Sequence, residues 1–276
     1  MYYEKTGHSP SGVEQCRYDG SRLLFRGPRR TLEGDFVACL GGTETFGKFV
    51  SQPYPDLLEG MTGMPCVNFG WPNAGVDVFA KDRALLDCAG RARLCVLQVP
   101  GALNMSNMFY RVHSRRNDRF LQATDALRAL FPEVDFTEFS FTRHMIGRLQ
   151  QVSSDRLSHV RQELARVWTA GMSSLLREIG SPVVLLWLSD RSPDAEPETP
   201  DIWEDPALVT REMLEALRCD AHRIVELKLT PSDRGTEAAR LRTPQDRRAA
   251  RAMLGRNAHQ HAAETLMPVL SEMFEP

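Results

Sequence analysis

Short apolar runs that alternate with longer helix-patterned stretches constrain this chain more than any other feature. The run Val183–Leu188 is apolar at every position. Strands that are buried on both faces of a parallel sheet have this composition, whereas half-exposed strands alternate apolar with polar residues. We therefore predict five parallel strands, at Phe36–Leu40, Cys66–Phe69, Leu94–Val99, Val183–Leu188 and Ile224–Leu229.

The stretches between these runs have the spacing of amphipathic helices. In Ser154–Ile179, for example, Leu157, Val160 and Leu164 fall on one helical face. Strands that alternate with helices form a parallel sheet with helices on both faces. We therefore predict an α/β fold, a three-layer α/β/α sandwich with the flavodoxin-like strand order 2-1-3-4-5. Helices are expected in the second half of Phe49–Met61, in Lys81–Gly90, Ser154–Ile179 and Pro206–Leu217, and in a last segment around Leu266–Met273 that Pro268 would kink.

Some segments depart from this pattern. Asp135–Phe141 alternates acid or hydroxyl side chains with phenylalanine, which indicates a half-exposed edge strand. Residues 192–205 and 231–244 are polar and rich in proline or charge, and we expect surface loops there. The chain contains no internal repeat and no clear boundary, so we predict a single domain over residues 1–276, with residues 1–35 as an N-terminal extension.

Charge and composition argue against several classes of function. Lys and Arg number 34 and Asp and Glu 36, and a net charge of -2 gives no support to binding of nucleic acid or an anionic membrane. No apolar run approaches the roughly 20 residues of a membrane span, and no secretory signal is visible. The six cysteines form no metal-ligand pattern, and neither GxGxxG nor GxxxxGK[ST] occurs. We therefore expect a cytoplasmic protein without metal or cofactor.

The turn after the first strand is the best candidate for chemistry. Gly41 and Gly42 are followed by Thr43, at the expected start of a helix. Glycines allow a sharp turn and a close approach of the backbone to a ligand, and a helix N-terminus favours an anion or an oxyanion. The carboxyl ends of parallel strands are also where ligands bind in open α/β sheets. The alternative is a plain strand-to-helix turn with Thr43 as the N-cap.

Four pieces of the chain resemble the characteristic blocks of SGNH (GDSL-type) hydrolases, in the same order. Gly41–Gly47 is similar to the first block and Val67–Gly75 to the second. Gly101–Asn104 is similar to the Gly-x-Asn block with one residue inserted. His259 falls near the position of that family's catalytic histidine. The chain as a whole, including the opening Phe25–Arg30, also resembles an uncharacterised bacterial family of unknown function.

The SGNH resemblance implies ester hydrolysis or acyl transfer, with roles for particular residues. Thr43 would be the nucleophile and His259 the base, with His261 as the alternative base. The oxyanion would be held by the glycine turn at Gly42–Thr43, by N–H groups between Asn73 and Gly75, and by the side chain of Asn104. Asn104 as an ordinary turn residue is the competing interpretation.

The sequence also departs from the SGNH pattern at these positions. Thr43 stands where the family has serine, and Gly42 stands where it has aspartate. Arg256 occupies the place of the acid three residues before the histidine, so Asp246 or another carboxylate would have to orient His259.

Basic residues follow the third predicted strand. Arg111, Arg115 and Arg116 could overhang the pocket and hold a sulfate, phosphate or carboxylate. The alternative is solvated loop charge that pairs with local acids such as Asp118.

Two hypotheses of different classes remain. The first is an SGNH-like esterase or acyl-transfer enzyme that acts on a polar or anionic ester, for instance of a carbohydrate. The second is a non-catalytic protein of the same fold that binds an anionic or carbohydrate ligand. The missing serine and acid favour the second, whereas the glycines, Asn104 and His259 favour the first. The oligomeric state is left open.

Overall fold

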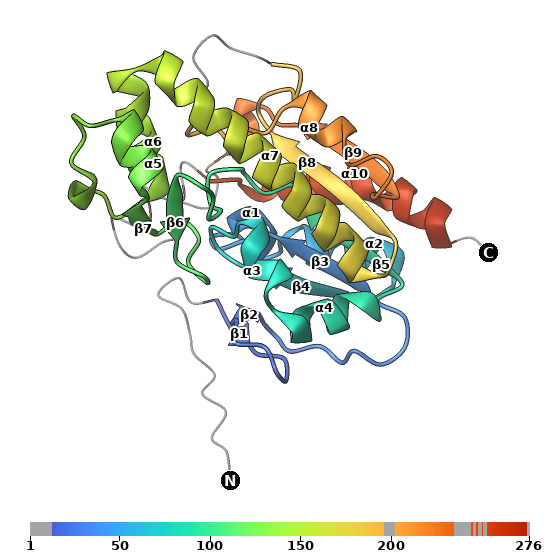
Figure 1. Cartoon of the computed structure of the whole chain (residues 1–276). Coiled ribbons are helices and arrows are strands. Elements are labelled where there is room, and N and C mark those ends of the chain that lie inside the picture. The colour runs from blue at the N-terminus through green and yellow to red at the C-terminus, as the bar shows by residue number, and fades with distance from the viewer. Residues whose placement is uncertain are drawn as a thin grey trace.

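A five-stranded parallel sheet forms the centre of the protein (Figure 1). The computed structural model describes residues 13–195, 202–234, 244, 247, 250 and 253–274. The strand order is β4-β3-β5-β8-β9, and each neighbouring pair is parallel. Counted along the chain, this is the order 2-1-3-4-5, so the predicted topology is confirmed. The strands are β3 (Val37–Gly41), β4 (Cys66–Gly70), β5 (Leu94–Gln98), β8 (Val183–Ser189) and β9 (Arg223–Lys228).

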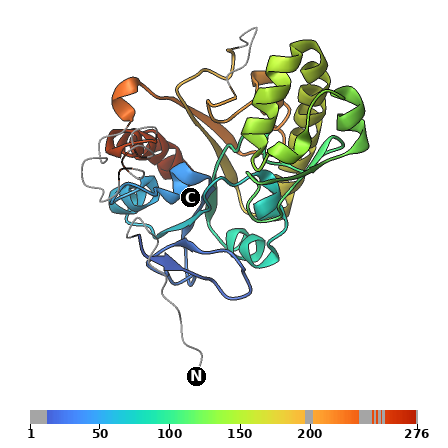
Figure 2. The same cartoon turned by 90° about the vertical axis from the view of Figure 1, so that its left-hand side faces the viewer.

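Helices cover both faces of the sheet and give the expected three layers (Figure 2). One face carries α2 (Tyr54–Thr62) and α10 (Arg256–Phe274), and the other carries α3 (Val76–Ala80), α4 (Arg83–Gly90) and α7 (Ser154–Ile179). Because successive side chains of a strand point to opposite faces, each strand supplies both cores. This explains the unbroken apolar runs in the sequence. None of the described helices is long and apolar enough to cross a membrane.

Local capping residues set the ends of the helices. The predicted helix Ser154–Ile179 is confirmed as α7, because the Ser153 side chain accepts the N–H of Arg156 and Gly180 adopts a φ of 76° at the other end. Helix α8 (Arg211–Glu215) is shorter than predicted, since it begins only after Thr210, whose hydroxyl accepts the N–H of Met213.

The stretch between β5 and α7 forms a small insertion that the sequence did not predict. It holds an antiparallel pair, β6 (Tyr110–Val112) and β7 (Phe120–Ala123), followed by α5 (Asp125–Leu130), the 3-10 turn η1 (Phe136–Glu138) and α6 (Thr142–Val152). The edge strand predicted at Asp135–Phe141 is therefore wrong. The Asp135 carboxylate accepts the N–H and the hydroxyl of Thr137, at 2.9 and 2.7 Å, and this local cap stabilises η1 instead.

The N-terminal residues form an antiparallel pair, β1 (Gln15–Cys16) and β2 (Phe25–Arg26), beside β4. The guanidinium of Arg26 is buried and donates to four backbone carbonyls in the segment that ends the short helix α1 (Thr43–Phe46). The acceptors are the carbonyl oxygens of Phe46, Gly47, Val50 and Ser51, at 2.6 to 3.2 Å. The hairpin thus fixes the chain just after the glycine turn.

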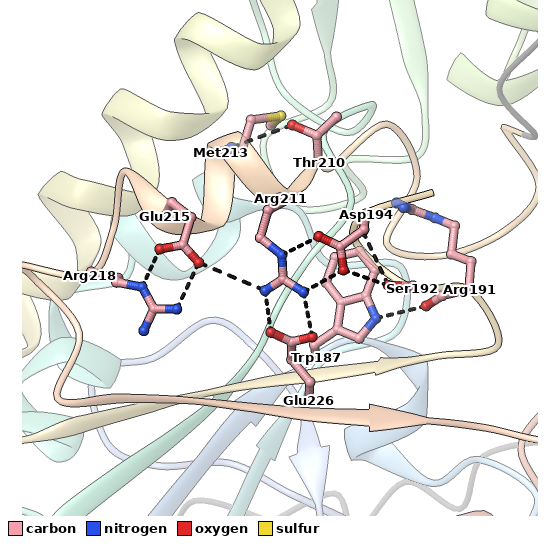
Figure 3. Close-up of polar contacts among 10 residues, drawn as sticks. All are labelled: Trp187, Arg191, Ser192, Asp194, Thr210, Arg211, Met213, Glu215, Arg218 and Glu226. Carbon is pink, nitrogen blue, oxygen red and sulfur yellow. Dashed lines mark hydrogen bonds and ion pairs between the residues drawn. The ribbon is translucent and has the colours of Figure 1, made fainter. Parts of the chain in front are cut away.

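Ion pairs tie the segments around α8 to the edge of the sheet (Figure 3). Arg211 contacts Asp194 and, on β9, Glu226, while Arg191 donates to the carbonyls of Pro206 and Val209. The loop predicted at 192–205 is therefore packed at its described end, and residues 196–201 lie outside the described part. Of the loop predicted at 231–244, the structure describes η2 (Pro231–Asp233), Arg234 and residue 244.

Candidate functional site

A cavity of about 250 Å³ opens at the carboxyl ends of β3, β4 and β5. The register of these strands places Gly41 beside Gly70, and Leu40 beside Leu97, so the turns that follow them meet at one level. Helix α6 and the segment before α8 complete the wall. The cavity lies where parallel α/β sheets bind their ligands.

A chain of hydrogen bonds joins three of the residues singled out from the sequence. Thr43 Oγ1 accepts the N–H of Asn73 at 3.1 Å and donates to Asn73 Oδ1 at 3.3 Å. Asn104 Nδ2 donates to the carbonyl of Asn73 at 3.3 Å, and Thr142 Oγ1 donates to Asn104 Oδ1 at 2.9 Å. Asn73 has a φ of 57°, a left-handed conformation that asparagine tolerates better than most residues. The structure therefore brings Thr43, Asn73 and Asn104 together in one cavity wall.

The side chain of Gln98, at the end of β5, holds the glycine turn. Its Oε1 accepts the N–H of Gly42 at 3.0 Å, and the N–H and hydroxyl of Thr45 at 3.2 and 2.7 Å. A Cβ atom at Gly41 would come within 2.0 Å of Thr45 Oγ1, so only glycine fits there. The Gly42 N–H is thus occupied within the protein, as is that of Gly75, which donates to Asn117 Oδ1 at 3.1 Å. Neither group is free to bind an oxyanion in this arrangement.

Three carboxylates line the same cavity, those of Glu44, Asp118 and Asp205, and the sequence did not assign any of them to the site. Burial raises the pKa of the Glu44 carboxyl, and the nearby charge of Asp205 raises it further; Gln98 Nε2 donates to Glu44 Oε2 at 3.0 Å. Burial also raises the pKa of Asp118, whose Oδ2 accepts from Asn73 Nδ2 at 3.3 Å. Titratable groups with shifted pKa values in a cavity are typical of functional sites.

Aromatic side chains from α6 and the segment before α8 form the rim. The ring of His144 lies 5.8 Å from that of Phe141 and 5.7 Å from that of Trp203, and Trp203 is 60% exposed. Arg143 donates to the carbonyl of Ile202 at 2.7 Å and forms an ion pair with Asp205. The guanidinium thus contacts the chain on both sides of Trp203.

The arginines predicted to hold an anion are placed elsewhere. Arg111, Arg115 and Arg116 have exposed side chains and do not line this cavity. Arg111 donates to the carbonyl of Asn107, and the carbonyl of Arg115 accepts from Trp71 Nε1 at 2.8 Å. Among the described residues, Arg143 is the one arginine that lines the cavity.

His259 does not join Thr43 and Asn104 in the cavity. It is 1% exposed on α10, and its Nδ1 accepts the N–H of Tyr54 at 3.1 Å. The neutral ring must therefore carry its proton on Nε2, the wrong tautomer for taking a proton from Thr43 through that nitrogen. Burial, aided by the charge of Arg26, lowers the pKa of His259 to about 3. With Thr43 and Glu44, His259 lines a separate void of about 10 Å³.

In the part of the chain that the structure describes, His261 forms an ion pair with an acidic residue. Its Nδ1 lies 3.0 Å from Oδ1 of the buried Asp233, and the imidazole is half exposed. Asp246, the acid expected to orient His259, lies outside the described residues. Within those residues, no group of three or more His, Cys, Asp or Glu side chains is placed to hold a metal ion.

Comparison with known proteins places the chain in a family. The family model described as a domain of unknown function (DUF6473) matches residues 1–274. The chain belongs to the DUF6473 family. A search of curated proteins found no match to this DUF6473 member.

Two solved structures are similar to the DUF6473 chain. A gut microbial diltiazem-metabolizing enzyme aligns with a TM-score of 0.44 and 9% identity, over 88% of this chain and 48% of its own. The DUF6473 chain therefore spans about half the length of that enzyme. A catalytic mutant of Axe2, an acetylxylan esterase from Geobacillus stearothermophilus, aligns with a TM-score of 0.40 and 11% identity, over 88% of this chain and 95% of its own.

Proposed function

We propose that this protein binds a sugar or a similar hydroxyl-rich ligand in the cavity beside Thr43. The observation that carries the proposal is the exposed indole of Trp203 at the rim of a cavity whose wall consists of amide, hydroxyl and carboxylate side chains. An aromatic face packs against the C–H surface of a sugar ring, while fixed polar groups bind its hydroxyls. At about 250 Å³ the cavity is smaller than the roughly 300–1,000 Å³ of typical ligand pockets, which suits one sugar ring.

The polar wall is held in place before any ligand arrives. Asn73 and Asn104 are bonded to each other and to Thr43 and Thr142, and Gln98 is bonded to the glycine turn. Side chains that are already ordered lose less conformational entropy on binding, so the same contacts give a tighter complex.

Ligand binding is tested by titrating the full chain with a panel of neutral and amino monosaccharides. The readouts are tryptophan fluorescence and calorimetry. We expect Trp203→Ala to lose most of the affinity and Trp203→Phe to keep part of it, since the smaller ring still offers an aromatic face. The control is Leu121→Ala, which removes a large exposed apolar side chain on β7, away from the cavity. A panel without any binder, or binding that Trp203→Ala leaves intact, would overturn the proposal.

Ester hydrolysis is a second candidate, favoured by the convergence of Thr43, Asn73 and Asn104 in one cavity. Thr43 would attack the ester carbonyl, and the side chain of Asn104 would donate to the oxyanion. Against it stands the hydroxyl of Thr43, whose partner among the described residues is Asn73 rather than an imidazole or a carboxylate.

An activated-ester assay separates the two candidates. An esterase that uses Thr43 should lose several orders of magnitude in rate as Thr43→Ala and should keep or gain rate as Thr43→Ser. If the wild type is inert toward such esters while it binds a sugar, binding alone is the function.

A further inference from the structure

The cavity contains more negative than positive charge. Glu44, Asp118 and Asp205 line it, whereas its wall contains one arginine among the described residues, Arg143. That guanidinium is paired with Asp205, so the charges of these two side chains largely cancel. The two remaining carboxylates give the cavity an excess of negative charge when they are ionised.

The side chains that donate hydrogen bonds to these two carboxylates are neutral. Gln98 Nε2 donates to Glu44 and Asn73 Nδ2 donates to Asp118, and both donors are side-chain amides. In the described part of the chain, no ion pair joins either carboxylate to a lysine or an arginine. Arg116 and Arg119 act on Asp118 at longer range. A carboxylate removed from water without a cationic partner is stabilised strongly by a cation that enters the site.

The aromatic rings at the rim also favour a cation over an anion, for a different physical reason. The face of Trp203 carries the negative side of an aromatic quadrupole, which attracts cations, and Phe141 shows this attraction within the protein, because the guanidinium of Arg119 lies over its ring at 4.3 Å from the centroid. His144 lies between the two rings, with centroid distances of 5.7 and 5.8 Å. Carboxylates inside and aromatic faces at the mouth are unfavourable surroundings for an anion.

From this charge pattern we infer that the ligand carries an ammonium group, as an amino sugar does. The inference rests on the proposed sugar binding and adds the chemical class of the sugar. The ring packs against Trp203, its hydroxyls meet the amide wall, and its ammonium group donates to Glu44 and Asp118. The anionic ligand that the sequence suggested is replaced by a cationic one.

The affinity should then depend on pH. Glu44 faces Asp205, Arg143 and Gln98, and Asp118 faces Arg116, Arg119 and Asn73. Burial raises the pKa of both carboxyls, so they ionise over a higher pH range than exposed carboxyls do. An ammonium ligand binds the ionised forms, so its affinity should rise with pH through this range and its binding should release protons. A neutral sugar should show neither effect.

The test compares matched sugars on the full chain at constant ionic strength. Glucosamine, galactosamine and mannosamine are measured against glucose, galactose and mannose, and against glucuronic and galacturonic acid. We expect an amino sugar to bind about tenfold more tightly than its neutral parent, and the uronic acids to bind more weakly than either. Calorimetry in two buffers with different ionisation enthalpies counts the protons released.

Variants then locate the ammonium group. Glu44→Gln and Asp118→Asn should each reduce the ratio of amino-sugar to neutral-sugar affinity, and the double variant should abolish it. Asp77→Asn is the matched control, because Asp77 forms an ion pair with Lys81 on α3 and does not line the cavity.

The outcomes are distinguishable. Neutral and amino sugars that bind equally, or a preference that survives the double variant, overturn the inference and leave sugar binding intact. If no sugar binds, the proposed function fails and the inference fails with it.

A measurement without ligand separately tests the premise that the pKa of Glu44 is raised. Since the pKa of Glu44 is raised in the folded state, the contribution of Glu44 to stability should fall as pH rises through that pKa, and this loss should appear as the difference between the pH profiles of the wild type and Glu44→Gln.

Discussion

The hydroxyl of Thr43 forms two hydrogen bonds with Asn73, and these bonds argue against Thr43 as a nucleophile. A nucleophile needs a base within hydrogen-bond reach, but the nearby buried histidine is used differently. His259 accepts from the backbone of Tyr54 and stacks on its ring, with 6.4 Å between centroids. It serves to join α10 to the start of α2.

The buried neutral state of His259 should be visible in the pH dependence of stability. Its pKa is about 3 in the folded protein, against 6.5 for an unperturbed histidine side chain. The unfolded chain therefore binds a proton that the folded one rejects, and the free energy of unfolding should fall as pH drops from 6.5 toward 3. For a shift of this size the full loss is on the order of 5 kcal/mol.

Urea unfolding at a series of pH values measures this slope. His259→Gln removes the titration and retains a side-chain acceptor, so the difference between the two pH profiles isolates the histidine from the carboxylates. His261→Gln is the control on the same helix, with a half-exposed imidazole. Equal slopes in wild type and His259→Gln would contradict the assignment.

Sequence reasoning found those site residues that directly follow strands. Thr43, Asn73 and Asn104 come after β3, β4 and β5, whose ends converge in any parallel sheet of this order. Glu44, Asp118 and Trp203 also line the cavity but were not singled out from the sequence. The last two come from segments without a regular period, and only tertiary packing brings them to the cavity.

Among the elements, α6 has the most direct connection to the proposed ligand. Arg143 on this helix holds Ile202 and Asp205, and thereby the segment that presents Trp203. The helix itself lies in the insertion after β5, and its buried apolar stripe is short, so it was not predicted from the sequence. By contrast, both ends of α7 could be predicted from the sequence. A serine cap precedes its one long apolar stripe, and a glycine follows it.

We predict that loosening the Arg143 contacts releases Trp203 without unfolding the protein. In Arg143→Gln the emission of Trp203 should shift to the red, its anisotropy should fall and sugar affinity should drop. The stability should change by less than about 1 kcal/mol, because the ion pair is only partly buried. Background from the other tryptophans is subtracted with Trp203→Phe.

The matched control is Arg218→Gln, which breaks the exposed ion pair with Glu215 on α8 and leaves the cavity untouched. Unchanged Trp203 emission and affinity in Arg143→Gln would mean that the segment is held by other contacts.

On the scale of the whole molecule, the sheet separates two cores of unequal size. The smaller core lies between the sheet and the pair α2 and α10. Leu266 and Leu270 of α10 are fully buried in it, in the same apolar cluster as Val37 of β3 and Leu94 of β5. The last helix is therefore needed to cover the central strands.

Leu266→Ala should lower the free energy of unfolding by about 2–5 kcal/mol, the usual cost of a large cavity in a core. Met267→Ala, at the next position, is the control, because Met267 is 38% exposed and its loss should be nearly neutral. Urea denaturation gives both values. Similar midpoints for the two variants would show that α10 contributes little to the core.

The side chain of Arg26 helps to hold the segment that follows the glycine turn. Its four acceptors all lie between Phe46 and Ser51, within a few residues of Thr43 and Glu44. Through this side chain the N-terminal hairpin braces the chain beside the cavity from outside the parallel sheet. A chain that started at residue 36 would retain every strand of the parallel sheet, yet four carbonyls beside the cavity would lose the guanidinium that they share.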